Sequence, residues 1–151
     1  MPWVRTREIL NLSRKFYKQM RLFFEELKDQ NDVQRMEMLL DAIRRHVEYL
    51  EHELLYLEKE TPPDVLNAWF QFAPDPPELN TDPMERIRSG MTVDDVVQVT
   101  LDFDSALVEF YQRTAESTEF VEVQEIFRNL MKNIETEKKK LVQDASGMRQ
   151  L

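Results

Sequence analysis

Apolar residues recur at spacings of three and four in four separate stretches of this chain, with polar residues at the positions between them. This period predicts helices that each bury one face, because residues three or four apart lie on the same side of an α-helix. The first stretch follows Thr6, a residue type that often caps a helix N-terminus, and is expected to run to about Lys28. The first predicted helix therefore buries a stripe made of Ile9, Leu12, Phe16, Met20, Phe23 and Leu27.

The second stretch lies between two strong breaks. Residues 29–32 are polar and suit a helix end, whereas Pro62 and Pro63 stop a helix because proline lacks the backbone N–H donor. The connection between the first two stretches is short, so their helices are predicted to be antiparallel neighbours in a hairpin over about residues 6–60. The second stripe consists of Met36, Leu39, Leu40, Ile43, Val47, Leu50, Leu54 and Leu57.

The segment 61–91 is predicted to be a crossover that carries the chain back along the bundle. It holds six of the seven prolines together with Gly90, and it is too long for an ordinary loop. Within it, residues 65–72 are expected to form one or two helical turns. Their aromatic side chains leave two interpretations open: a lid over an edge of the bundle, or an exposed apolar patch that binds a partner. The residues concerned are Trp69, Phe70 and Phe72, with Trp3 and Val4 extending either surface.

The last two stretches predict a second helical hairpin over about residues 92–145. Thr92 and Asp95 form a capping-box pattern, residues 117–119 are a polar break, and the tail from Ala145 onward is expected to fray. Two hairpins joined by one long crossover predict an all-α fold, an antiparallel four-helix bundle in a single domain over residues 1–151. The two stripes consist of Val96, Val97, Val99, Phe103, Leu107, Phe110 and Tyr111, and of Val123, Ile126, Phe127, Leu130, Ile134, Leu141 and Val142.

The second hairpin resembles a copy of the first. A shift of 87 residues places apolar positions of one hairpin on apolar positions of the other, in both helices. Agreement of this kind predicts an internal repeat. The matched pairs are Phe16 with Phe103, Phe23 with Phe110, Phe24 with Tyr111, Leu40 with Phe127, Val47 with Ile134, and Leu54 with Leu141.

Composition narrows the functional classes. The formal net charge of −9 disfavours nucleic acid and anionic membrane surfaces as partners. The chain has no cysteine, which excludes disulfides, thiolate catalysis and cysteine-bound metal clusters and is typical of a reducing compartment. No signal-peptide pattern or long uncharged apolar run occurs, so a cytoplasmic protein is expected. Glycine-rich phosphate loops, nucleophile elbows and His-Glu-x-x-His motifs are also absent from the sequence.

An aromatic pair near the end of the first helix, followed sixteen positions later by an apolar residue, occurs in both hairpins. The pair at residues 23–24 precedes Leu40, and the pair at residues 110–111 precedes Phe127. This pattern resembles the rubrerythrin-type branch of the ferritin-like superfamily. The similarity covers both hairpins, about two thirds of the chain, and implies a ferritin-like four-helix bundle.

That family holds two metal ions inside the bundle, with a carboxylate on the first helix of each hairpin and a Glu-x-x-His pair on the second. The resemblance places the six ligand positions at Tyr17, Asp104, Val47, Leu50, Ile134 and Glu137. Only two of these positions keep a carboxylate, and neither histidine is present. The resemblance therefore implies a retained fold whose di-metal site is degenerate.

The two remaining carboxylates, Asp104 and Glu137, are expected to face one another inside the bundle. Buried carboxylates must share a proton, find hydroxyl donors such as Tyr17 or Tyr111, or reach solvent. One interpretation is a hydrogen-bonded polar plug in the core, and the other is a single Fe, Mn or Zn ion or an acid–base pair. His46 lies beside the buried stripe, where it either forms an ordinary hydrogen bond or supplies one imidazole ligand.

The sequence therefore predicts a ferritin-like helical bundle without cofactor that acts non-catalytically, as a homodimer or by binding another protein. The competing class is a metal-dependent oxidoreductase that uses Asp104 and Glu137 with His46 or Tyr17. A third possibility is a small-molecule carrier, which requires a cavity between Tyr17, Val47, Asp104 and Ile134.

Overall fold

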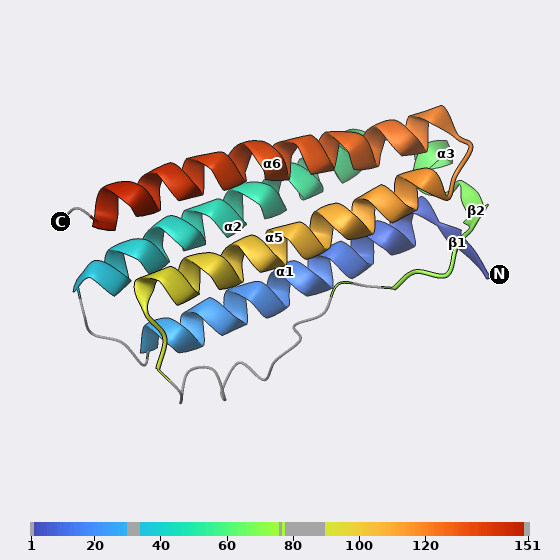
Figure 1. Cartoon of the computed structure of the whole chain (residues 1–151). Helices are drawn as coiled ribbons and strands as arrows, with labels where there is room; N and C mark the ends of the chain where they lie inside the picture. Colours follow the sequence, from blue (N-terminus) through green and yellow to red (C-terminus); the bar gives the residue numbers. More distant parts are fainter. Residues whose placement is uncertain (1, 30–33, 76, 78–89, 150–151) are drawn as a thin grey trace.

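The computed structural model describes residues 2–29, 34–75, 77 and 90–149. Four long helices lie side by side, and a short helix with two short strands lies at one end of them (Figure 1). The prediction of a helical bundle is confirmed. The elements in chain order are β1 (Trp3–Arg5), α1 (Thr6–Asp29), α2 (Gln34–Glu60), α3 (Pro63–Leu66), β2 (Trp69–Gln71), α5 (Val93–Glu116) and α6 (Val121–Arg149).

The long helices form two antiparallel pairs, α1 with α2 and α5 with α6 (Figure 1). The end of α2, together with α3 and β2, lies at one end of the bundle, and α5 begins at the other end. Consequently α5 runs in the same direction as α2, and α6 in the same direction as α1. The second helices of the two pairs, α2 and α6, also pack against each other.

One hydrophobic core is shared by all four long helices and by the two strands. Between α1 and α5 it is aromatic: the ring of Phe103 lies 5.9 Å from Phe16, 5.7 Å from Phe23 and 5.8 Å from Phe24, each in an edge-to-face arrangement. Edge-to-face pairs are a favoured geometry of aromatic rings and add to the stability that burial provides. This cluster fixes the distance between the two hairpins on that side of the bundle.

The start of α5 follows the sequence prediction. The Thr92 side chain accepts a hydrogen bond from the Asp95 backbone N–H, and the Asp95 carboxylate accepts one from the Thr92 backbone N–H. This capping box satisfies two donors that a helix N-terminus leaves without intrahelical partners. The break at residues 117–119 and the end of α2 before Pro62 are also confirmed.

The start of α1 differs from the prediction. Thr6 is the first residue of the helix rather than its cap, and its buried hydroxyl has no hydrogen-bond partner in the described part of the chain. The carboxylate of Glu8 accepts a hydrogen bond from the Arg5 backbone N–H instead, at 3.4 Å. The Thr6 N–H donates to the Ala68 carbonyl at 3.3 Å, so the helix start is tied to the segment between α3 and β2.

The prediction of helical turns over residues 65–72 is wrong in part. Residues 3–5 and 69–71 pair as an antiparallel two-stranded sheet, with Val4 opposite Phe70. The expected helical turns after Pro62 are limited to α3, and the aromatic residues that follow alternate between the core and solvent, as strand residues do. Much of the predicted crossover and of the break at residues 29–32 lies outside the described residues.

The C-terminal prediction is also wrong. The helix α6 continues to Arg149 instead of fraying at Ala145, because the Ala145 side chain packs into the core and is only 1% exposed. Val142, predicted on the buried stripe, is exposed.

Candidate functional site

All six positions that the resemblance assigned to metal ligands lie in the interior of the bundle. They come from all four long helices, and the most exposed of them, Glu137, is only 8% accessible. Three of them are aliphatic and form part of the hydrophobic core. Their side chains have no oxygen, nitrogen or sulfur atom that could bind a metal ion. The six positions are Tyr17 in α1, Val47 and Leu50 in α2, Asp104 in α5, and Ile134 and Glu137 in α6.

The polar centre of the interior is a contact between Asp104 and His46. The Oδ2 atom of Asp104 lies 2.6 Å from Nε2 of His46, and the side chains are 0% and 3% exposed. Residues adjacent on a helix point about 100° apart. Val47 lines a groove between α1 and α2 on the outside of the bundle, which is described below. Its neighbour His46 therefore faces α5 and α6. The sequence analysis left two roles open for His46, and a hydrogen bond was one of them.

Burial raises the pKa of the Asp104 carboxyl, because a charged form is disfavoured away from water. The hydrogen bond from His46 acts in the opposite direction, as does the charge of His46, and Lys138 adds a smaller effect of the same sign. The second carboxyl oxygen, Oδ1, is buried and has no hydrogen-bond partner in the described part of the chain. The pair is therefore held by one short contact in an environment that resists a net charge.

The expected pairing of Asp104 with Glu137 is not what the structure shows. Glu137 Oε1 accepts a hydrogen bond from Lys140 Nζ at 3.0 Å, one helical turn along α6. The ammonium of Lys140 also lies 5.8 Å from the centre of the Tyr49 ring. Glu137 is thus turned toward the outer side of the α2–α6 contact, and His46 takes the place beside Asp104 that the sequence analysis gave to Glu137.

The same interior contains two buried phenols, Tyr17 and Tyr111. Burial raises the pKa of Tyr17 well above its usual value, and the neighbouring Tyr111, Asp104 and Glu51 raise it further. Burial likewise raises the pKa of Tyr111, although the Ser13 side chain acts in the opposite direction. The Ser13 hydroxyl itself donates to the Ile9 carbonyl, and the Tyr111 hydroxyl has no hydrogen-bond partner within the described residues. Both phenols are therefore neutral elements of the core.

A pocket of about 260 Å³ opens between α2 and α6, directly outside His46. Its wall combines the imidazole with two further basic side chains, two carboxylates and one phenol. The sequence analysis missed this pocket, because a cavity between two helices depends on how far apart they lie. The lining residues are Ala42, Arg45, His46, Tyr49, Glu137, Lys140, Leu141 and Asp144.

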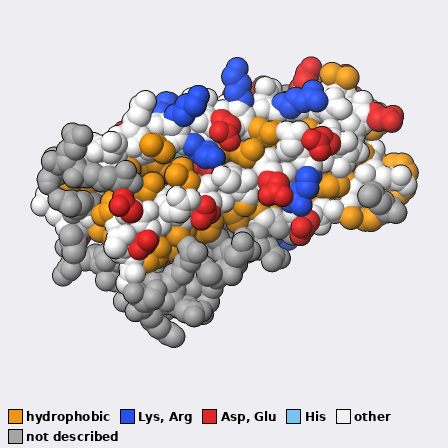
Figure 2. All heavy atoms as spheres, in the orientation of Figure 1, with side chains coloured by type: hydrophobic (Ala, Val, Ile, Leu, Met, Phe, Trp, Pro, Cys, Tyr) orange, Lys and Arg blue, Asp and Glu red, His pale blue; other side chains and the backbone are white. Residues whose placement is uncertain are grey.

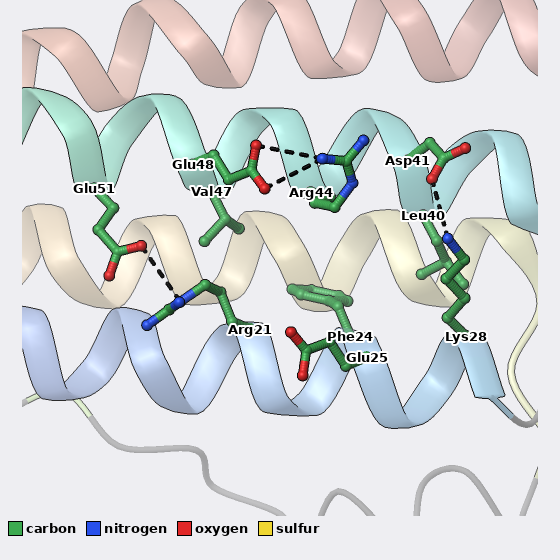
Figure 3. A pocket seen from close by; sticks show the side chains of 10 residues that line it. All are labelled: Arg21, Phe24, Glu25, Lys28, Leu40, Asp41, Arg44, Val47, Glu48 and Glu51. Carbon is green, nitrogen blue, oxygen red and sulfur yellow. Dashed lines mark hydrogen bonds and ion pairs between the residues drawn. The ribbon is translucent and has the colours of Figure 1, made fainter.

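A second depression of about 160 Å³ lies between α1 and α2 (Figure 3). Its floor is apolar and its rim is charged, with the ion pair between Arg21 and Glu51 at 3.3 Å on one side and that between Lys28 and Asp41 at 3.4 Å on the other. We call this surface the α1–α2 groove. It is lined by Arg21, Phe24, Glu25, Lys28, Leu40, Asp41, Arg44, Val47, Glu48 and Glu51.

The aromatic residues near the two strands combine the two interpretations that the sequence left open. Phe70 and Phe72 are buried and stack at 6.3 Å, so they cover the end of the bundle. Trp3 is 58% exposed and Trp69 is 50% exposed, both on the outer face of the sheet. The Arg5 guanidinium lies 5.2 Å from the centre of the Trp69 ring. Val4 points inward with Phe70.

Within the described residues, no three side chains of His, Cys, Asp or Glu are grouped so that they could hold a metal ion. In the same part of the chain, every helix is either too short or too polar to cross a lipid bilayer. Comparisons with protein-family models, curated proteins and solved structures found no match. The fold and site together define a helical bundle with a buried aspartate–histidine pair at its centre.

Proposed function

We propose that this protein is a ferritin-like four-helix bundle that has lost its di-metal centre and acts without catalysis, by associating with a second copy of itself. The direction of the helices supports the first part: two antiparallel hairpins have their second helices in contact, and the first hairpin ends at the opposite end of the bundle from the start of α5. The contact of Phe16 with Phe103 supports the internal repeat, because these residues match in the two hairpins.

The loss of the metal centre is inferred from the side chains that occupy the six positions where the resemblance places metal ligands. Val47, Leu50 and Ile134 are buried apolar side chains, and the fully buried carboxyl group of Asp104 is bonded to His46. Divalent Fe, Mn and Zn need several oxygen or nitrogen ligands that converge on one point. The competing function, a metal-dependent oxidoreductase that uses Asp104 and Glu137, would require Glu137 to leave Lys140 and turn inward.

The α1–α2 groove is the surface that we assign to self-association. Three basic and four acidic side chains line it, so its formal charge is −1, whereas the whole chain carries −9. Copies of an acidic protein repel one another on average, and a nearly neutral face with an apolar floor is where this repulsion is weakest. Figure 2 shows another face of the molecule, on which Lys and Arg side chains are likewise interspersed with Asp and Glu and hydrophobic side chains lie between them.

Charge complementarity within the groove favours a two-fold dimer. Glu25 has no ion-pair partner among the described residues, and Arg44 is paired only with Glu48 on its own helix, at 3.2 Å and more than half exposed. In a two-fold interface the same patch meets itself in reverse. Glu25 on α1 of one copy is then placed to contact Arg44 on α2 of the other, and the converse contact forms at the same time.

Elemental analysis of protein purified without chelator tests the metal-free centre. We expect less than stoichiometric iron, manganese and zinc, and no change in metal content in the variant Asp104→Ala. Stoichiometric metal that disappears in Asp104→Ala would overturn the loss of the centre and favour the oxidoreductase.

Sedimentation velocity over a range of concentrations tests the dimer. We expect Glu25→Arg to weaken association, because each reversal creates two like-charge contacts, and the double variant Glu25→Arg with Arg44→Glu to restore it. Arg45→Glu is the matched control, since Arg45 lines the pocket on the opposite side of α2. A wild-type protein that is monomeric at all concentrations would contradict the proposal, as would a double variant no better than the single one.

A further inference from the structure

The α2–α6 pocket differs from the α1–α2 groove in having a buried polar pair behind it. Its inner wall is the imidazole of His46, whose Nε2 atom is 2.6 Å from Asp104. This contact occupies Nε2, so Nδ1 is the ring nitrogen left for a ligand in the pocket. The contact also fixes the orientation of the ring, since rotating it would break the hydrogen bond of a fully buried carboxyl.

The contact with Asp104 decides how His46 meets the pocket. Both side chains are almost fully buried, and the carboxyl of Asp104 orients the imidazole in the manner of a carboxylate that orients a histidine. His46 therefore offers the pocket a ring nitrogen whose position is fixed from behind.

The charged side chains around the pocket are not all used within the protein. Lys140 is bonded to Glu137 at 3.0 Å, whereas neither Arg45 nor Asp144 has an ion-pair partner among the described residues. These two unpaired charges have opposite signs and come from facing helices, α2 and α6. A simple anion would be attracted by Arg45 but repelled by Asp144. A simple cation would be attracted by Asp144 but repelled by Arg45.

We propose that the α2–α6 pocket binds a small zwitterion of the α-amino acid class. Its carboxylate is held by the guanidinium of Arg45 and the Nδ1–H of His46, and its ammonium group by the carboxylate of Asp144. An arginine accepts a carboxylate through two parallel hydrogen bonds, which makes it the main anchor. The pocket volume of about 260 Å³ is slightly below the range of about 300 to 1,000 Å³ typical of drug-sized ligands, which suits a small molecule.

This site is separate from the proposed dimer face, because Arg45 and Arg44 lie on different sides of α2 and line different depressions. Self-association and ligand binding are therefore distinguishable: variants of Glu25 and Arg44 affect the first, and variants of Arg45 and Asp144 the second. Asp104 is a positioning residue in this site, since it acts on the ligand only through His46.

Nuclear magnetic resonance of the histidine rings is the direct test, because the chain has only two histidines. His52 is exposed on α2 and serves as an internal reference, and the variant His52→Gln identifies the His46 signals. The full-length protein labelled with ¹⁵N is titrated with each of the standard amino acids, and in parallel with acetate and with methylammonium. We expect at least one amino acid to move the His46 ring signals to saturation while leaving His52 in place, and acetate and methylammonium to bind more weakly.

Matched variants then assign the contacts. Arg45→Gln and Asp144→Asn each remove one charge-assisted contact at an exposed position, and each is expected to weaken binding of that amino acid about tenfold or more. Arg128→Gln, at an exposed position of α6 outside the pocket lining, is the control and is expected to leave the affinity unchanged. The proposal is overturned if no amino acid shifts His46, if acetate binds as tightly as the amino acid, or if Arg128→Gln weakens binding as much as Arg45→Gln.

Discussion

The two hairpins meet along two contacts of different chemistry. Between α1 and α5 the contact is aromatic, with Phe103 surrounded by three phenylalanine rings at 5.7 to 5.9 Å. Between α2 and α6 the contact includes His46 and Glu137, and a polar pocket opens outside them. A bundle built from two similar hairpins thus has one side closed by hydrophobic packing and one side where charged groups reach the solvent.

The difference follows from matched positions in the proposed repeat that carry different residues. Tyr17 in the first hairpin corresponds to Asp104 in the second, and Leu50 corresponds to Glu137. Both ionisable carboxylates therefore belong to the second hairpin, and His46 of the first hairpin bonds to one of them. The aromatic contact therefore joins the hairpins through apolar packing, whereas the buried pair and the polar pocket lie at the α2–α6 contact.

The aromatic contact should be the most sensitive part of the fold. We expect Phe103→Ala to lower the free energy of unfolding by about 3–5 kcal/mol, because it leaves a cavity among three rings that cannot close around it. Urea unfolding followed by circular dichroism measures this. Phe120→Ala, at a position that is 50% exposed, is the control and should change stability by less than about 0.5 kcal/mol. Equal losses in both variants would show that Phe103 is not a centre of packing.

The buried pair should come next. His46→Leu removes the hydrogen-bond partner that Asp104 has among the described residues and leaves the carboxyl buried, so we expect a loss of about 1–3 kcal/mol at neutral pH. The double variant His46→Leu with Asp104→Leu should recover much of this loss, since a buried ionic pair replaced by apolar side chains of similar volume is often neutral or stabilising. A double variant less stable than His46→Leu would mean that the carboxylate has another favourable contact.

The sequence predicts the aromatic contact better than the polar one. Helix period, the capping box at Thr92 and the break before Pro62 are local signals, and each depends on residues close together in the chain. Phe16, Phe23 and Phe103 all lie on predicted stripes, so their burial follows directly from the pattern.

The polar pair was harder to predict because it depends on how the helices are rotated. His46 and Val47 are neighbours, and a small change in the rotation of α2 decides which of them faces Asp104. The strand pairing of residues 3–5 with residues 69–71 depends on contacts between distant segments, and three-residue strands are too short for a periodic signal. The length of α6 was underestimated for a similar reason, because burial of Ala145 depends on its neighbours in space.

The pH dependence of stability distinguishes the polar α2–α6 contact from the aromatic α1–α5 contact. The expected change in stability is smaller than in the two substitutions above. Burial raises the pKa of Asp104, so the folded state keeps this proton to a higher pH than the unfolded state does. Wherever the folded state binds more protons, stability falls as pH rises. The contribution of Asp104 is therefore most favourable below its ordinary pKa of 3.8 and is lost as pH rises through the raised folded value.

The variant Asp104→Asn removes this titration while keeping the shape of the side chain. We expect the stability of the wild type, measured relative to Asp104→Asn by urea unfolding, to decline as pH increases from about 4. Phe103→Ala should show no such change in relative stability, because no ionisable group is removed. A relative stability of Asp104→Asn that rises with decreasing pH would mean that His46 lowers the folded pKa below the ordinary value.

The smallest effect is expected at Tyr111, a residue of the aromatic interior that carries a polar atom. Its hydroxyl is buried without a hydrogen-bond partner in the described part of the chain, so removing it should cost little or stabilise the fold by up to about 1 kcal/mol. Because burial raises the pKa of this phenol, the folded state stays neutral where the unfolded state ionises, and stability falls as pH rises above the ordinary value of 10.0. Tyr111→Phe should reduce that alkaline loss, whereas Tyr49→Phe, at an exposed position, should not change stability at neutral pH. A loss of 1 kcal/mol or more in Tyr111→Phe would show that the hydroxyl is bonded, with Ser13 as the nearest candidate, and would make this side of the interior as polar in its energetics as the α2–α6 contact.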